Sequence, residues 1–352
     1  MSGSRETKGE RVERACGTLH RLSRSPRFKR VGVSLVVSVL AFSVFSSTGA
    51  FAGGATGTKN WSRPIKLIRA SSATSQSQLD SVSCPSSTFC TVATATGAVI
   101  FQRDGKWSAP QPVNAGGSLD SISCTSSQYC VAVSDYEAVT FNGSSWSKAK
   151  VIGPDASYSV SCPTTSFCAT VGASGTIGGP KFLATYNGNA WRKTTIPSAK
   201  VMSDRLMDVS CATPTYCVGV NLNGSLTFFD GKKWTTKNSN EPKNLISVSC
   251  PIVNSCVAVS MLGKWVAIHN ESRSAPKSIP SLDGDVPYSV SCATASTCVV
   301  ITLTGKAATW RGGHWSKSSQ VFKSPAVGST DVSCSSDGRC MAVNSRGDVS
   351  IY

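Results

Sequence analysis

The sequence predicts an all-β fold: a seven-bladed β-propeller with four-stranded blades, closed into a ring by the N-terminal strand. Three observations lead to this prediction. Cysteine pairs of one spacing recur seven times, β-rich segments follow each pair, and a turn precedes a tryptophan that recurs in most repeats. Four short strands in about 40–45 residues is the size of one propeller blade. The 352 residues are therefore expected to form one ring rather than two separate domains.

The first 52 residues have the pattern of a secretory signal peptide. Residues 1–30 carry nine Lys or Arg and three Glu, and the apolar run that follows spans residues 31–45. This run is shorter than the roughly 20 apolar residues that cross a membrane, and the Ala-Phe-Ala triplet at 50–52 is a cleavage pattern. We expect cleavage after this triplet, a short linker over residues 53–59, and a secreted or extracellular protein. The alternative is an uncleaved N-terminal membrane anchor.

Fourteen of the fifteen cysteines are predicted to form structural disulfides. Cys16 precedes the apolar run and is expected to leave with the leader. Structural zinc needs four ligands, usually with Cys-x2-4-Cys spacing, whereas two thiols five residues apart in each repeat fit a bridge across a hairpin in an oxidising compartment. We therefore predict no metal site and no cofactor. The predicted bridges are Cys84–Cys90, Cys124–Cys130, Cys162–Cys168, Cys211–Cys217, Cys250–Cys256, Cys292–Cys298 and Cys334–Cys340.

Each repeat is predicted to contain four strands, named a to d. Strand a ends at the first cysteine, which follows a Ser and, before it, a Val or Ile, and strand b begins at the second cysteine. Strand c ends at an aromatic residue, and a turn with Gly leads to the Trp of strand d, as from Phe141 to Trp146 and from Phe229 to Trp234. Asn-Gly and Asp-Gly between β-rich segments are strong hairpin signals, because these residues tolerate positive φ.

The two ends of the repeat array predict how the ring closes. The last repeat has strands a, b and c, and Tyr352 lies 18 residues after Cys334, as Phe229 does after Cys211. An isolated strand d precedes the first repeat at residues 60–67, and its Trp61-Ser62 matches the Trp-Ser of three other repeats. We expect this strand to complete the last blade, which would cover an open strand edge.

Over residues 60–352 the chain resembles secreted β-propeller repeat proteins, in detail the actinobacterial proteins with Ser-Val-Ser-Cys, Phe-Cys and Trp-Ser repeats. It is distantly similar to sialidase-type propellers, whose Asp-box turns also lie between strands c and d. The Asp that an Asp-box has two residues before its Gly is aromatic here, so the resemblance transfers no sialidase catalytic residue. The matching Gly-x-x-Trp turns are Gly143/Trp146, Gly188/Trp191, Gly231/Trp234 and Gly312/Trp315.

The irregular loops indicate where a ligand would bind. In a propeller the a–b hairpins and c–d turns share one face, and the b–c and d–a loops share the other. The second face carries the insertions, and variable loops on a rigid scaffold usually hold function. The candidate ligand-binding residues on this face are Asp135, Tyr136, Glu137, Asp204, Arg205, Asp283, Asp285, Arg346 and Asp348.

Catalytic motifs are missing from the sequence. It has no Gly-x-Ser-x-Gly, no His-Glu-x-x-His and no phosphate loop. The two histidines after the leader, His269 and His314, lie at c–d turns and are interpreted as turn residues rather than catalytic bases. We therefore predict a non-enzymatic binding or interaction module for a glycan, cell-surface or protein ligand. The alternative is an extracellular glycan-processing hydrolase or lyase, which carboxylates, Arg or His converging at the channel mouth would favour.

The positive charge has two interpretations. Removing the leader, with its net charge of +6, lowers the total of +16 to +10, which would suit an anionic cell-wall polymer. However, many Lys and Arg fall on strand d, where they protect the outer edge of a blade from pairing with other chains. Nucleic acid is not expected, because no basic helix or recognition motif accompanies the charge. We expect a monomer.

The repeated tryptophans also have two interpretations. They could form a ring of sugar-stacking platforms, or each could pack between neighbouring blades against the aromatic residue of strand c. Packing is favoured, since large aromatic side chains dominate burial energetics. The fifth repeat departs from the pattern, because Arg273 takes the Trp position and Trp265 lies on strand c.

Overall fold

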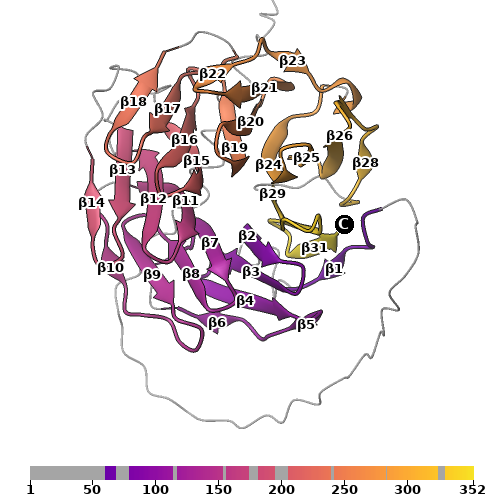
Figure 1. Ribbon diagram of the computed structural model, residues 1–352. Helices are drawn as coiled ribbons and strands as arrows, with labels where there is room; N and C mark the ends of the chain where they lie inside the picture. The colour runs from indigo at the N-terminus through magenta and orange to yellow at the C-terminus, as the bar shows by residue number, and fades with distance from the viewer. Residues whose placement is uncertain are drawn as a thin grey trace, which may run out of the picture. The chain divides into compact units, whose positions relative to one another are not determined.

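The computed structural model describes residues 60–68, 79–113, 117–153, 156–173, 181–194, 205–238, 242–282, 284–323 and 330–352. The chain divides into Met1–Asn60, of which only Asn60 is described, and one compact unit, Trp61–Tyr352. This unit consists of seven antiparallel sheets arranged around a common axis (Figure 1), which confirms the predicted seven-bladed β-propeller. The predicted signal peptide and linker lie outside the described residues. Within the described ranges, the model contains no helix with the length and apolar character needed to cross a membrane.

Strands a and b form the inner half of each blade. The innermost strands, in chain order from blade 1 to blade 7, are β2 (Leu79–Ser86), β7 (Ser121–Ser126), β11 (Ala156–Thr164), β15 (Leu206–Thr213), β19 (Leu245–Ile252), β24 (Pro287–Thr294) and β29 (Thr330–Cys334). The second strands are β3 (Phe89–Thr94), β8 (Tyr129–Val133), β12 (Phe167–Ala173), β16 (Tyr216–Asn221), β20 (Ser255–Ser260), β25 (Thr297–Thr302) and β30 (Cys340–Asn344).

Strands c and d form the outer half. The third strands are β4 (Ala98–Arg103), β9 (Glu137–Phe141), β13 (Lys181–Tyr186), β17 (Leu226–Phe229), β21 (Lys264–His269), β26 (Lys306–Arg311) and β31 (Asp348–Ile351). The outermost strands are β5 (Lys106–Trp107), β10 (Lys150–Val151), β14 (Trp191–Lys193), β18 (Trp234–Lys237), β22 (Ser272–Arg273), β27 (His314–Trp315) and, for blade 7, β1 (Ile65–Lys66). Blades 1, 5 and 6 add a second short outer strand, namely β6 (Gln111–Pro112), β23 (Lys277–Ser278) and β28 (Ser319–Gln320). A 3-10 turn, η2 (Pro280–Leu282), precedes blade 6.

The predicted strand boundaries at the cysteines were wrong in six blades. There strand a continues two residues past the first cysteine, as β2 does from Cys84 to Ser86, and strand b begins one residue before the second. The reason is that pairing resumes beyond the bridge after a register shift, as between Ser86 and Phe89. Only in blade 7 does strand a end at the first cysteine, Cys334.

All seven predicted disulfides are present. Each joins strands a and b of one blade, with the two Cα atoms 3.8–4.1 Å apart. In four blades the two cysteines are direct partners in the strand register, as with Cys211 and Cys217. Bridges of this number indicate an oxidising, extracellular environment.

The repeated tryptophans pack against strand c aromatics. The ring centroids of Phe229 and Trp234 lie 4.9 Å apart, and similar pairs occur in blades 2, 3 and 6. In blade 5, Trp265 lies 4.7 Å from Trp310 of blade 6, so its position on strand c fills the space between the two blades. These contacts are those expected of aromatic packing rather than of free sugar-stacking platforms.

Strand β1 is the fourth strand of the last blade. The sheet order is β1-β31-β30-β29, with Ile65 paired to Val349 and Lys66 to Asp348. The ring of Trp61 lies 5.3 Å from that of Tyr352. The contribution of this pairing to holding the ring closed stays a prediction.

Candidate functional site

The innermost strands are joined by two circles of hydrogen bonds around the channel. In the first circle, the N–H of each first cysteine donates to the Oγ of the serine that precedes the first cysteine of the previous blade, at 2.9–3.0 Å. In the second circle, the N–H two residues before each first cysteine donates to the side chain three residues before the first cysteine of the previous blade. Hydroxyl side chains therefore replace a backbone ladder between blades, which explains the serines of the repeat without assigning them nucleophilic roles.

In two blades of the second circle the acceptor is an aspartate instead of a serine. The acceptor is a serine in five blades, at 3.2–3.3 Å, but Asp208 in blade 4 and Asp331 in blade 7. Their Oδ2 atoms accept the N–H of Val248 and Val82 at 2.8 Å. A charge-assisted bond to a carboxylate is shorter and stronger than one to a hydroxyl, so these two positions hold the next blade more tightly.

Asp208 is surrounded by donors. Its Oδ1 accepts the hydroxyl of Ser159 at 2.6 Å and the N–H of Val209 at 2.8 Å. Its Oδ2 accepts the hydroxyl of Ser247 at 3.0 Å as well as the N–H of Val248. Asp208 therefore bridges blades 3, 4 and 5, and all of its strong acceptor positions are occupied.

Asp331 has a similar place in blade 7. Its Oδ1 accepts the hydroxyl of Ser289 at 2.7 Å and the N–H of Val332 at 2.9 Å. Burial raises its pKa to about 6, against the lowering effect of these bonds, and the charge of Asp208 adds to the increase. Burial also raises the pKa of Asp208. Both carboxylates keep some surface toward the channel and are otherwise enclosed by protein.

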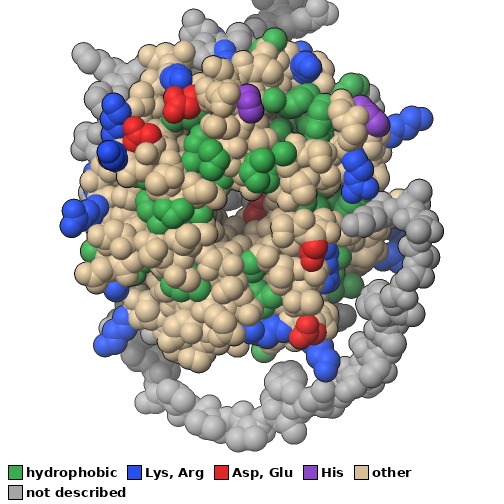
Figure 2. Space-filling model, in the orientation of Figure 1, with side chains coloured by type: hydrophobic (Ala, Val, Ile, Leu, Met, Phe, Trp, Pro, Cys, Tyr) green, Lys and Arg blue, Asp and Glu red, His purple; other side chains and the backbone are tan. Residues whose placement is uncertain are grey.

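A cavity of about 160 Å³ occupies the channel between these strands. Its described lining consists of serines, Val or Ile and the two aspartates, and contains no Lys, Arg or His. Figure 2 shows the hollow at the centre of the ring with an acidic side chain inside it, and Lys and Arg mostly toward the periphery. The polar groups of the channel are thus largely committed to bonds between blades.

A second group of acids lies where the d–a loops enter blades 1 and 2. We call Asp80, Asp120 and Asp135 the acidic mouth. Asp80 and Asp120 directly precede the channel serines Ser81 and Ser121, and Asp135 lies in the b–c turn of blade 2. Burial raises the pKa of Asp120 well above its ordinary value, and the charges of Asp135 and Asp80 raise it further. This group of carboxylates therefore carries a repulsion that a cation would relieve.

The predicted residues Asp135, Tyr136 and Glu137 lie together beside this mouth. Tyr136 is 43% exposed, and its carbonyl oxygen accepts the N–H of Ile152 at 2.8 Å. Val151, which pairs with Glu137 in the sheet, is 71% exposed. Tyr136 is thus an exposed aromatic side chain next to Asp135, and Val151 is an exposed apolar side chain beside Glu137.

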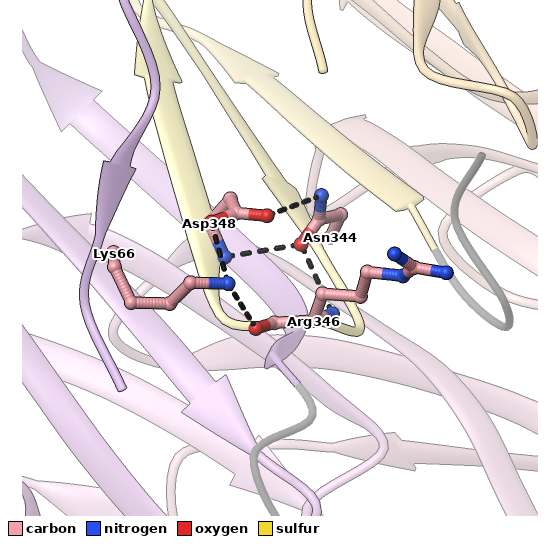
Figure 3. Close-up of polar contacts among 4 residues, drawn as sticks. All are labelled: Lys66, Asn344, Arg346 and Asp348. Carbon is pink, nitrogen blue, oxygen red and sulfur yellow. Dashed lines mark hydrogen bonds and ion pairs between the residues drawn. The ribbon is translucent and has the colours of Figure 1, made fainter. Parts of the chain in front are cut away.

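The predicted residues of blade 7 serve the local structure. Asp348 forms an ion pair with Lys66 of β1 at 2.8 Å, and its N–H donates to Asn344 Oδ1 at 3.0 Å. The carbonyl of Arg346 accepts the Nζ of Lys66 at 2.9 Å. Figure 3 shows these contacts, with the guanidinium of Arg346 pointing away from them.

The remaining predicted residues do not join the acidic mouth. Asp285 accepts the hydroxyls of Thr302 and Thr304 and so ties the d–a loop of blade 6 to a b–c turn. Arg205 is half-buried just before β15. Asp204 and Asp283 lie outside the described residues. Among the described candidate ligand-binding residues, Asp135 is the one whose charge acts on other acids. The region around Asp135 is therefore the candidate site.

Sequence reasoning missed Asp80, Asp120, Asp208 and Asp331. Comparing the same position across repeats would have found them, because Asp208 and Asp331 replace a serine that five blades share. Asp80 and Asp120 occupy the position before it, where other blades have residues such as Tyr158, Met207 and Ile246.

Comparisons with known proteins support the fold. No protein-family model and no curated protein matches the chain. A streptogramin B lyase structure is similar with a TM-score of 0.68 and 8% identity, covering 83% of this chain and 97% of that one. The WD40 propeller domain of Doa1 gives 0.65 and 12%, covering 84% and 97%, and YCF48 bound to D1 peptide gives 0.61 and 14%, covering 84% and 95%. At these identities the likeness establishes a propeller that enzymes and binding proteins share.

Proposed function

We propose that this protein is a non-enzymatic interaction module whose ligand is a protein or peptide with a basic segment. The observation that carries the proposal is the acidic mouth. The N–H of Asp120 donates to Val133 O at 2.9 Å, beside the turn that carries Asp135 and the exposed Tyr136, and the charges of Asp135 and Asp80 act on Asp120. A Lys or Arg side chain would neutralise the acids, while an apolar neighbour on the same ligand would cover the ring of Tyr136. The propeller fold commonly serves such interactions.

The choice of a protein ligand has support from comparison, since one of the similar propellers, YCF48, is bound to a peptide in its structure. Aromatic side chains such as Tyr136 also stack on sugars, so glycans and anionic cell-wall polymers belong in the same binding screen as competing ligands. An anionic polymer would be repelled by the acidic mouth, which is why we favour a cationic ligand.

The experiment compares two single-charge variants. The mature protein is immobilised and tested against a peptide library of graded net charge, with glycans and wall polymers alongside. At a pH that ionises Asp120, Asp120→Asn should weaken binding of basic peptides by about tenfold or more, because losing the charge that faces a bound Lys or Arg costs more than about 1.4 kcal/mol. Asp104→Asn is the matched control, since Asp104 is an exposed acid in a c–d turn on the opposite face. Equal effects of the two variants, or binding only of anionic polymers, would contradict the proposal.

A second candidate function rests on the same pair of acids. Asp120, with its raised pKa, could hold a proton next to a second carboxyl group, and glycan hydrolases and lyases use such pairs of acids for acid–base chemistry. Turnover in a broad glycosidase and lyase screen that disappears in Asp120→Asn would favour this enzyme over the binding module. Peptide binding without turnover would favour the module.

We also propose that the protein is exported and cleaved after residue 52. The seven disulfides and the leader pattern support this. N-terminal sequencing of the exported protein should begin at residue 53. An intact leader in the membrane fraction would favour the anchored alternative.

A further inference from the structure

One junction of the ring differs from the others in connectivity. Six junctions join blades that follow each other along the chain, so the chain itself keeps those blades together. The seventh joins β29 of blade 7 to β2 of blade 1, between residues as distant in sequence as Asp331 and Val82, which are 249 positions apart. At this junction, which we call the 7–1 junction, the chain reaches β2 only from β1, and β1 is joined to the rest of blade 7 by strand pairing and side-chain contacts alone.

The channel side of the 7–1 junction has a stronger acceptor than most. Val82 donates to Asp331 at 2.8 Å, whereas five of the other junctions use a serine at 3.2–3.3 Å. Cys84 donates to Ser333 at 2.9 Å, as its counterparts do elsewhere. Asp208 makes the same carboxylate contact at the 4–5 junction, so the aspartate alone does not distinguish blade 7.

The a–b hairpin of blade 7 supplies a charged contact across the junction. Arg339 donates from its guanidinium to the carbonyl of Ser87, in the a–b hairpin of blade 1. The equivalent residue of blade 4, Tyr216, contacts the backbone of Asn254 in blade 5 with a neutral hydroxyl. Hydrogen bonds from Ser335 and Ser87 lower the pKa of Asp337, so its ionised carboxylate is held against the same hairpin. In blade 6 the equivalent positions are Ala295 and Thr297.

Strand β1 contacts blade 7 on the opposite, outer side of the sheet. The hydrogen bonds of this segment go to β31 and the turn before it, such as Ser62 N–H to Ile351 O at 2.7 Å and Leu67 N–H to Gly347 O at 2.8 Å. These bonds use neither Asp331 nor the a–b hairpin of blade 7. The inner and outer hydrogen bonds are therefore made by separate sets of residues, while Leu67 and Ile68 pack on the apolar cluster shared by blades 7 and 1.

We propose that blade 7 is a dedicated closing blade, in which Asp331, Asp337 and Arg339 hold it to blade 1 independently of β1. The ring then has two separable closures. The inner one binds the first blade directly, while the outer one completes the sheet of the last blade and covers its edge. Removal of the outer closure lowers the stability of blade 7 but leaves the 7–1 junction shut.

Hydrogen exchange on the full mature protein separates the two closures, because local opening is measured amide by amide. The inner variant, D331S/D337A/R339T, gives blade 7 the residues that blade 6 has at these positions. Exchange of the Val82 and Cys84 amides should become at least about tenfold faster in it. The corresponding amides of the 5–6 junction, Val290 and Cys292, should not change and serve as the internal control.

The outer variant lacks residues 60–67. It should melt at a lower temperature, yet its Val82 and Cys84 amides should stay within about threefold of the parent rates. If this deletion prevents folding, W61A/K66A removes the main side-chain contacts of β1 and is measured in its place. The proposal is wrong if the outer variant accelerates exchange at Val82 and Cys84 as much as the inner variant does. It is equally wrong if the inner variant leaves both amides unchanged, in which case β1 alone closes the ring.

Discussion

The channel and the acidic mouth both contain aspartates, but the two regions treat them in opposite ways. Asp208 in the channel receives four hydrogen bonds from its own and neighbouring blades. Asp120 at the mouth lies among other carboxylates that raise its pKa further. A carboxylate surrounded by donors stabilises a fold, whereas one surrounded by like charges costs stability and is usually retained for function. The groups around each aspartate therefore distinguish structural acids from candidate binding acids, which the sequence alone does not.

The largest effect is expected from removing a channel acid. Asp208→Ala leaves two backbone N–H groups and two serine hydroxyls without their acceptor, which should lower the free energy of unfolding by about 3 kcal/mol or more. Asp208→Ser should lose less than half of this, because serine fills the same position in five blades. Urea denaturation at pH 7 measures both. Equal losses in the two variants would show that the position needs a carboxylate.

The next effect is a pH dependence from the other channel acid. The pKa of Asp331 is raised from 3.8 to about 6, so the folded protein binds the proton more tightly than the unfolded chain does. The protonated form therefore adds stability that is fully present below about pH 4 and is lost as the pH rises through 6, by at most about 3 kcal/mol. The free energy of unfolding of the parent minus that of Asp331→Ser, measured from pH 4 to 8, should fall across this range. A flat difference would show that Asp331 titrates normally.

Replacing an acid of the acidic mouth should raise the stability of the fold, whereas replacing Asp208 should lower it. Burial and neighbouring acids disfavour the charged form of Asp120, so Asp120→Asn should raise the free energy of unfolding by about 1 kcal/mol at a pH high enough to ionise Asp120. Binding of a basic peptide should fall in the same variant. In the parent, that binding should strengthen as rising pH ionises Asp120, and the variant should lack this step. Thermal denaturation and binding titrations at several pH values test both halves, and a destabilised Asp120→Asn would place Asp120 with the channel acids.

The smallest effect belongs to an acid at the outer edge. Lys66 pairs with Asp348 at 2.8 Å, but the side chains are 42% and 22% exposed. Exposed ion pairs contribute little, so Lys66→Ala should change the free energy of unfolding by about 0.5 kcal/mol. The change should shrink further in high salt. A loss comparable to that of Asp208→Ala would mean that β1 carries far more of the ring than its exposed contacts suggest.

The propeller fold could be predicted from the sequence because the same residues recur at the same places in each repeat. Seven cysteine pairs at near-constant spacing fixed the number of blades, and the turn before each Trp fixed the outer hairpin. The strand ends near the disulfides were predicted wrongly. Strand pairing resumes at Ser86 and Phe89 after a register shift, and no residue type in the repeat indicates such a shift. Pairing in a sheet is decided by neighbouring strands as well as by local sequence.

The site was only partly predictable. Asp135, Tyr136 and Glu137 stood out as an acidic-aromatic cluster in a b–c loop, and their role in binding stays a prediction. Asp285 and Asp348 looked the same in sequence, yet each is bound by residues from a neighbouring turn or from β1. Such partners are distant along the chain, so charge and loop position alone could not separate the two kinds of acid.

The hydrogen bonds around the channel also have a direction. Each bond of the two circles runs from an N–H of one blade to a side chain of the blade before it, including the pair from blade 1 to blade 7. The ring therefore has a handed order of donors and acceptors but no intrinsic first blade. A circular permutant that begins at another junction would keep every one of these bonds. At its new junction, however, a neutral residue would take the position of Arg339, so that junction would lack the charged contact that blade 7 makes to blade 1.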